Sequence, residues 1–196
     1  FGVVNAQTID DDPLPPLPSF LKDAANESDF FSLQLETTVL GKQDPGDEKK
    51  AFAKAIMENA PFGCRPIEVA YYYRDLGLGK ISQFGDEGRA YARGWPRLYN
   101  PIIVEFFKNI GVDPLAPNLD GDATAWCAVF VNYCLARAQC KKKDQNIGPA
   151  ELAFCTKSAS SGSFRCFGSE VVGEPKVGDI AVWALEGSVH GCDLGK

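Results

Sequence analysis

The segment 122–138 constrains the fold more than any other part of the sequence. Apolar side chains recur there at i, i+3, i+4, i+7 and i+8, the spacing that places them on one face of a helix. Thr124 is a good N-cap, so the sequence predicts a helix that begins after Thr124 and runs to about Ala138, with this face turned to the core. The residues of the face are Cys127, Phe130, Val131, Cys134 and Leu135.

Proline and glycine mark the limits of the remaining elements. Apolar spacing predicts helices at about 48–60, from Pro66 to about 77, and at about 101–110, the first two forming a helical hairpin. Residues 78–98 are rich in Gly and Arg and are predicted to be irregular. Two short strands are predicted at the C-terminal end, over residues 179–184 and 188–194.

The length and the charge distribution predict one domain behind an acidic lead-in. The chain has 196 residues and a net charge of −6, and all of this excess lies in residues 1–50, which hold 10 acids and 4 bases. The rest of the chain, residues 51–196, carries no net charge, which argues against a nucleic-acid partner. No apolar run reaches the length of about 20 residues that crosses a bilayer. The predicted divisions are an extended Pro-rich lead-in over 1–47, a helical subdomain over 48–95 and a core over 96–196.

Seven cysteines with a single histidine indicate disulfides rather than a metal site. No C-x-x-C pair occurs, and an odd count fits three bridges plus one thiol in an oxidising compartment, either secreted or periplasmic. Residues 1–7 resemble the tail of a signal peptide cleaved after Ala6. The alternative is a cytosolic protein with seven buried thiols. The favoured bridges are Cys155 with Cys166, then Cys134 with Cys140, and one to Cys192.

Cys127 is the candidate nucleophile. In the first turn of a helix, unpaired N–H groups and the positive end of the dipole favour a thiolate and can bind an oxyanion. His190 is the only imidazole in the chain, and pairing of the two predicted strands would bring it to this helix terminus. The alternative, on periodicity alone, is that Cys127 belongs to the core, as we expect for Cys134. His190 could equally be a structural strand histidine.

Four segments together resemble a known family. The segments are TAWCAVFVNYCL at 124–135, NPIIVEFF at 100–107, EPKVGDIAVW at 174–183 and SVHGCDLG at 188–195. They resemble the bacterial NlpC/CHAP-like cysteine peptidases of the cell wall. The resemblance covers residues 96–196, about half of the chain.

The resemblance implies an α+β, papain-like fold in which the cysteine helix packs on an antiparallel sheet that carries the histidine. It implies an acyl-enzyme mechanism on a peptide or amide bond of peptidoglycan. Cys127 would be the nucleophile, His190 the general base and then the acid, and Trp126 would line the substrate cleft. Asp122 and Thr124 would order the loop and cap the helix. No metal or cofactor is implied.

One expected residue of that family is absent from the sequence. Members keep a polar residue after the histidine strand that orients the imidazole, and Asp193 would face away from His190. Another region, a backbone carbonyl, or residues beyond Lys196 would then supply the orienting group. This absence keeps open a non-catalytic domain that binds the cell wall or a partner. The Tyr71–Tyr73 cluster would then dock an immunity or adaptor protein, unless these rings are simply packed; a third alternative is acyl transfer.

Overall fold

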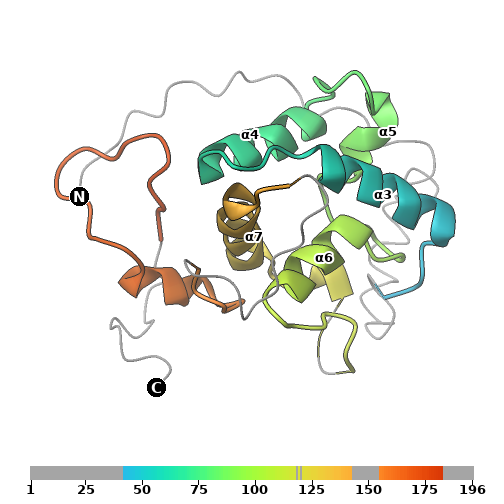
Figure 1. Ribbon diagram of the computed structural model, residues 1–196. Helices are drawn as coiled ribbons and strands as arrows, with labels where there is room; N and C mark the ends of the chain where they lie inside the picture. The colour runs from blue at the N-terminus through green and yellow to red at the C-terminus, as the bar shows by residue number, and fades with distance from the viewer. Residues whose placement is uncertain (1–41, 118, 120, 143–154, 183–196) are drawn as a thin grey trace, which may run out of the picture.

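The computed structural model describes residues 42–117, 119, 121–142 and 155–182. Within these ranges the chain folds into α-helices joined by loops, with two short 3-10 turns (Figure 1). The elements in order are α3 (Asp47–Asn59), α4 (Pro66–Gly77), α5 (Gly85–Ala90), α6 (Pro101–Asn109), η1 (Gly121–Ala123), α7 (Cys127–Gln139) and η2 (Ser161–Cys166).

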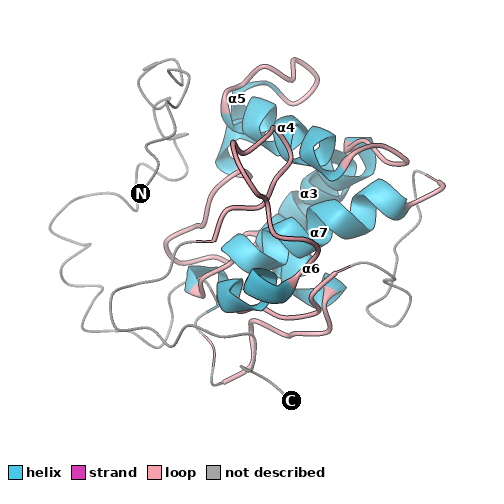
Figure 2. Ribbon diagram, turned by 90° about the vertical axis from the view of Figure 1, so that its left-hand side faces the viewer, coloured by secondary structure: helices cyan, strands magenta, loops and turns pink. Residues whose placement is uncertain are grey.

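The predicted α+β fold with an antiparallel sheet is wrong for the described residues. Figure 2 shows helices and loops there, and the only strand-like pairing in the described ranges is one isolated parallel bridge between Gln43 and Leu98. Residues 179–182 form no strand. The Asp179 carboxylate accepts the Lys176 N–H at 2.7 Å and closes a turn, while Ile180 stays 39% exposed. The second predicted strand, over 188–194, lies outside the described residues.

The helix α7 lies at the centre of the bundle, with α4 and α6 packed against it (Figure 1). The three helices meet in a cluster of aromatic rings. The ring centroids of Tyr133 on α7 and Phe106 on α6 lie 4.6 Å apart. The hydroxyl of Tyr73 on α4 donates to the hydroxyl of Tyr133 at 3.2 Å. The main core includes the buried side chains of Ile56, Val69, Leu76, Tyr91, Ile102, Phe107 and Val129. This core draws on residues from both predicted divisions, 48–95 and 96–196.

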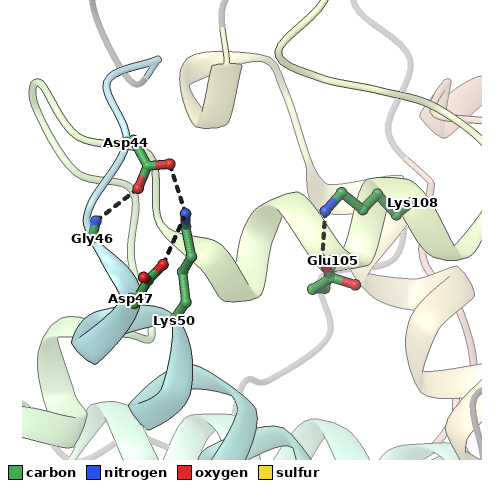
Figure 3. Close-up of polar contacts among 6 residues, drawn as sticks. All are labelled: Asp44, Gly46, Asp47, Lys50, Glu105 and Lys108. Carbon is green, nitrogen blue, oxygen red and sulfur yellow. Dashed lines mark hydrogen bonds and ion pairs between the residues drawn. The ribbon is translucent and has the colours of Figure 1, made fainter.

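Local hydrogen bonds fix where α3 begins. Asp44 accepts the Gly46 N–H at 2.7 Å and pairs with the Lys50 ammonium at 2.6 Å, as Figure 3 shows. The hydrogen bond from Lys50 holds the pKa of Asp44 below its usual value. Gly46 adopts φ 86°, a conformation that glycine reaches without a steric penalty. Asp47 then supplies negative charge in the first turn of α3, where it interacts favourably with the positive end of the helix dipole.

A buried arginine ties the end of α3 to the end of α7. The guanidinium of Arg137 donates to the Ala60 carbonyl at 2.8 Å and to the Glu58 carbonyl at 3.2 Å. These are the kind of C-terminal carbonyls that a helix leaves unsatisfied. The same guanidinium lies over the ring of Phe62, 5.3 Å from its centroid. Arg137 therefore fixes the position of α3 relative to the central helix.

The helix predictions agree with α3, α4 and α6 to within about one residue, and they miss α5. The helix that carries Cys127 begins later than predicted, at Cys127 itself. No helix among the described residues is long and apolar enough to cross a membrane.

Candidate functional site

Cys127 is exposed at the first position of α7. The first hydrogen bond of the helix runs from the Phe130 N–H to the Trp126 carbonyl at 2.9 Å. The N–H groups of the preceding first-turn residues have no partner within the helix, as at any helix start. Cys134, two turns along, is instead 4% exposed, and burial raises its pKa well above the usual value. The two thiols of the apolar face thus have opposite environments, and Cys127 lies outside the core.

Two apolar clusters flank Cys127. On one side, Trp126 packs against the main core with its ring edge-to-face to Phe130, at 6.2 Å between centroids. On the other side, the buried Ala128 belongs to a second cluster with Phe164 of η2. Val182, in the segment that leads toward His190, packs against this second cluster. The residues before and after Cys127 in the sequence thus belong to two different packed surfaces.

Asp122 anchors the loop that precedes α7. Its Oδ2 accepts the N–H groups of Trp95 at 2.8 Å and of Asn100 at 2.9 Å. Asn100 caps α6 by accepting the Ile102 N–H at 2.9 Å, so one carboxylate connects the approach to α7 with the start of α6. Asp122 is 2% exposed, and burial raises its pKa from 3.8 to about 6. Its Oδ1 is buried without a hydrogen-bond partner among the described residues.

Thr124 does not cap α7, contrary to the sequence prediction. Its N–H donates to the Gly121 carbonyl at 3.2 Å and closes the 3-10 turn η1, so the chain is not yet helical at Thr124. Trp126 occupies the N-cap position, without a capping side chain. Cys127 is consequently the first residue of the helix rather than the third. Its backbone N–H is then one of the donors that a helix start leaves without a partner inside the helix.

Asn132 fixes a second segment on α7. It is fully buried, its Oδ1 accepts the Thr156 N–H at 2.9 Å, and its amide donates to the Ser158 carbonyl at 2.9 Å. The Ser163 hydroxyl also donates a hydrogen bond to the Thr156 hydroxyl oxygen at 2.9 Å. Between the two anchored residues, Lys157 adopts φ 52°, a left-handed conformation that is uncommon for a residue with a side chain. Sequence analysis missed this role, although one Asn amid apolar residues was a signal for it.

The described residues do not include His190 or Asp193. The predicted pairing of the Cys127 thiol with the only imidazole of the chain is therefore not tested by the structure. In the described ranges no three His, Cys, Asp or Glu side chains gather as they would around a metal ion.

Two of the predicted disulfides are wrong. Cys134, Cys140 and Cys155 are reduced thiols, so neither the Cys134–Cys140 nor the Cys155–Cys166 bridge is present. Cys134 lies in the main core, whereas Cys140 lies in a separate cluster with Ala136, because six residues along a helix turn a side chain to a different face. Cys64 and Cys127 are also reduced, and Cys166 is disulfide-bonded. The predicted bridge to Cys192 lies outside the described residues.

Comparison of the chain with protein families, curated proteins and solved structures found no match.

Proposed function

We propose that this protein is a cysteine hydrolase that cleaves a peptide or amide bond through Cys127. One observation carries the proposal: the only thiol at the start of a described helix is exposed, while another thiol of the same helix is buried. α7 has 13 residues, so several aligned peptide dipoles end at Cys127. A nucleophilic thiol needs access to substrate and positive potential, and this position offers both.

The mechanism follows from the chemistry of a thiol at that place. The thiolate of Cys127 attacks the carbonyl carbon, and the N–H groups of the first turn donate to the oxygen that becomes negative. The amine leaves with a proton, and a thioester to Sγ remains. Water then attacks the thioester and releases the acid together with the free thiol. His190 is proposed as the base that takes the thiol proton and as the acid that gives it to the amine.

The loop anchored by Asp122 supports this chemistry by holding the start of α7 in place. An oxyanion site requires donors that are fixed before the charge develops. The two bonds from Trp95 and Asn100 to one buried carboxylate connect the loop to the core, five residues before the nucleophile. We therefore assign Asp122 a positioning role and not a catalytic one.

Peptidoglycan is the proposed substrate, and the resemblance of the motifs around Cys127 and His190 supports it. The bond would lie in the peptide stem or cross-link, or would be the amide between muramic acid and the stem. Both bonds are attacked by the same thiol chemistry. Peptidoglycan lies outside the cytoplasmic membrane, so the proposal places the enzyme in the secreted or periplasmic compartment.

The alternative, a domain that only binds the cell wall or an adaptor or immunity protein, rests on the absent orienting residue, and its proposed docking surface is the tyrosine cluster of α4. Tyr73 is 5% exposed, and the hydroxyl of Tyr72 donates to the Ile56 carbonyl at 2.7 Å, so both rings contribute to packing. Only Tyr71 is exposed, with the Arg74 guanidinium 4.5 Å from its ring centroid. A single exposed tyrosine leaves little of the proposed docking surface.

Mass spectrometry of soluble fragments released from purified peptidoglycan tests the proposal. Wild type, Cys127→Ala and Cys134→Ala are compared, each with circular dichroism to show that it is folded. We expect defined fragments from wild type and from folded Cys134→Ala, and none from Cys127→Ala. Fragment masses would then name the bond. No release by any folded protein would overturn the hydrolase and, with co-sedimentation on peptidoglycan, favour the binding domain.

A further inference from the structure

The segment that follows residue 154 runs along α7 in the opposite direction to the helix. Cys155 packs against the cluster of Ala136 and Cys140, near the end of α7. Thr156 and Ser158 are bonded to Asn132, one turn or more closer to the helix start. The order of these contacts places Cys155 beside the last turn and directs the following residues toward Cys127.

Two reduced thiols, Cys140 and Cys155, are therefore neighbours in one apolar cluster. Cys140 is the C-cap of α7, is 3% exposed and directs its Sγ toward the Ala136 carbonyl at 3.7 Å. Cys155 is half-buried and packs on the same two-residue cluster. The bonds of the next residue, Thr156, to Asn132 limit how far Cys155 can move from the helix. The shared cluster places the two cysteine side chains near each other, as a disulfide requires.

We propose that Cys140 and Cys155 are an oxidisable pair that forms a disulfide on exposure to a low-molecular-weight disulfide. The thiolate of one cysteine attacks glutathione disulfide and releases one glutathione thiol. The second cysteine then attacks the mixed disulfide and releases the other glutathione. Two protein thiols become one disulfide, and one glutathione disulfide becomes two thiols. The new bond replaces a weak S–H···O contact and attaches the segment beside α7 covalently to the helix end.

The competing pair is Cys64 with Cys134. These thiols are close enough that a charge on Cys64 would raise the pKa of Cys134, and burial raises the pKa of both. Burial raises the pKa of Cys64, the more accessible thiol of that pair, so the pair offers little thiolate for the first attack on an oxidant. In the proposed pair the half-buried Cys155 makes the first attack, and the buried Cys140 has to reach only the mixed disulfide. Cys140 and Cys155 also pack on a cluster of their own, separate from the main core that holds Cys134.

The sequence allows a clean peptide assignment. Cleavage by trypsin after Arg137 and Lys141 leaves Cys140 in the peptide 138–141. Cleavage after Lys143 and Lys157 leaves Cys155 in the peptide 144–157. Cys134 remains with Cys127 in residues 109–137, and Cys64 lies in residues 55–74. Folded full-length protein is equilibrated with reduced and oxidised glutathione, quenched in acid, alkylated and digested without reduction.

We expect the peptides 138–141 and 144–157 to be recovered joined, with a mass lower by two hydrogen atoms than their sum. Cys140→Ser and Cys155→Ser should each abolish the joined species, and Cys64→Ser is the matched control that should retain it. The proposal is overturned if the two cysteines stay alkylated in oxidising buffer while circular dichroism shows the native fold. It is equally overturned if either of them is found joined to a different cysteine.

Discussion

The buried carboxyl of Asp122 should make the protein less stable as the pH rises from about 4 to 6. Its pKa is 3.8 in an unfolded chain and about 6 in the fold, because burial disfavours the charged form. Between these values the folded state binds more protons than the unfolded state. The free energy of unfolding must then fall as protons are removed. At about 1.4 kcal/mol per pKa unit, the full loss is about 3 kcal/mol.

Asp122→Asn isolates this effect from all other titrating groups. The amide oxygen can still accept from the Trp95 and Asn100 N–H groups, while the side chain no longer ionises. Urea unfolding followed by tryptophan fluorescence at pH 4, 5, 6 and 7 gives the free energy of unfolding of both proteins. Wild type should lose about 2 kcal/mol more than Asp122→Asn between pH 4 and 7, because part of the full loss falls below pH 4. Other groups, such as Asp44, contribute equally to both proteins and cancel.

Asp47→Asn is the control, since the Asp47 carboxylate is fully exposed and lies 3.8 Å from the Lys50 ammonium. Its pH profile should follow that of wild type. Parallel profiles for wild type and Asp122→Asn would show that the Asp122 carboxyl does not titrate in the fold as its burial implies, and the positioning role would lose its physical basis.

Three further predictions concern the residues that hold α7. Asn132→Ala should cost about 3 kcal/mol in urea unfolding and should hasten tryptic cleavage at Lys157, because the Thr156 N–H loses its acceptor. Equal cleavage rates in wild type and Asn132→Ala would contradict the anchoring of Thr156 by Asn132. Arg137→Ala should cost about 3 kcal/mol by leaving the Ala60 carbonyl unbonded, and Arg137→Lys should restore only part of it. Cys127→Ala should change stability by less than about 0.5 kcal/mol, since the side chain is exposed; a larger loss would indicate a structural thiol.

The helices whose bounds were predicted most accurately from the sequence are those that begin at a capping residue or a proline. Asn100 followed by Pro101 marks the start of α6, and the structure shows the Asn100 side chain capping the helix. Pro66 at the first position of α4 marks its start in the same way. Capping and proline effects act within a few residues, so the sequence alone contains them.

The features that sequence missed depend on contacts between distant residues. Thr124 is a good N-cap by type, yet its N–H completes the η1 turn, because Asp122 is held by Trp95 and Asn100 from another part of the chain. A strand was predicted over residues 179–184, but a strand needs a partner, and no described segment pairs with residues 179–182. The same limit applies to the site. The sequence predicts Cys127 in the first turn of its helix and Asp122 as a residue that orders the preceding loop, but not the partners of Asp122, Trp95 and Asn100.

Trapping of the acyl-enzyme tests the central claim, nucleophilic catalysis by Cys127, most directly. Hydroxylamine competes with water for a thioester and converts the released acid into a hydroxamate, which mass spectrometry distinguishes. With peptidoglycan as substrate, wild type should yield hydroxamates in proportion to the hydroxylamine added, and Cys127→Ala should yield neither hydroxamates nor acids. Acids released without hydroxamates, or equal release by Cys127→Ala, would contradict the account.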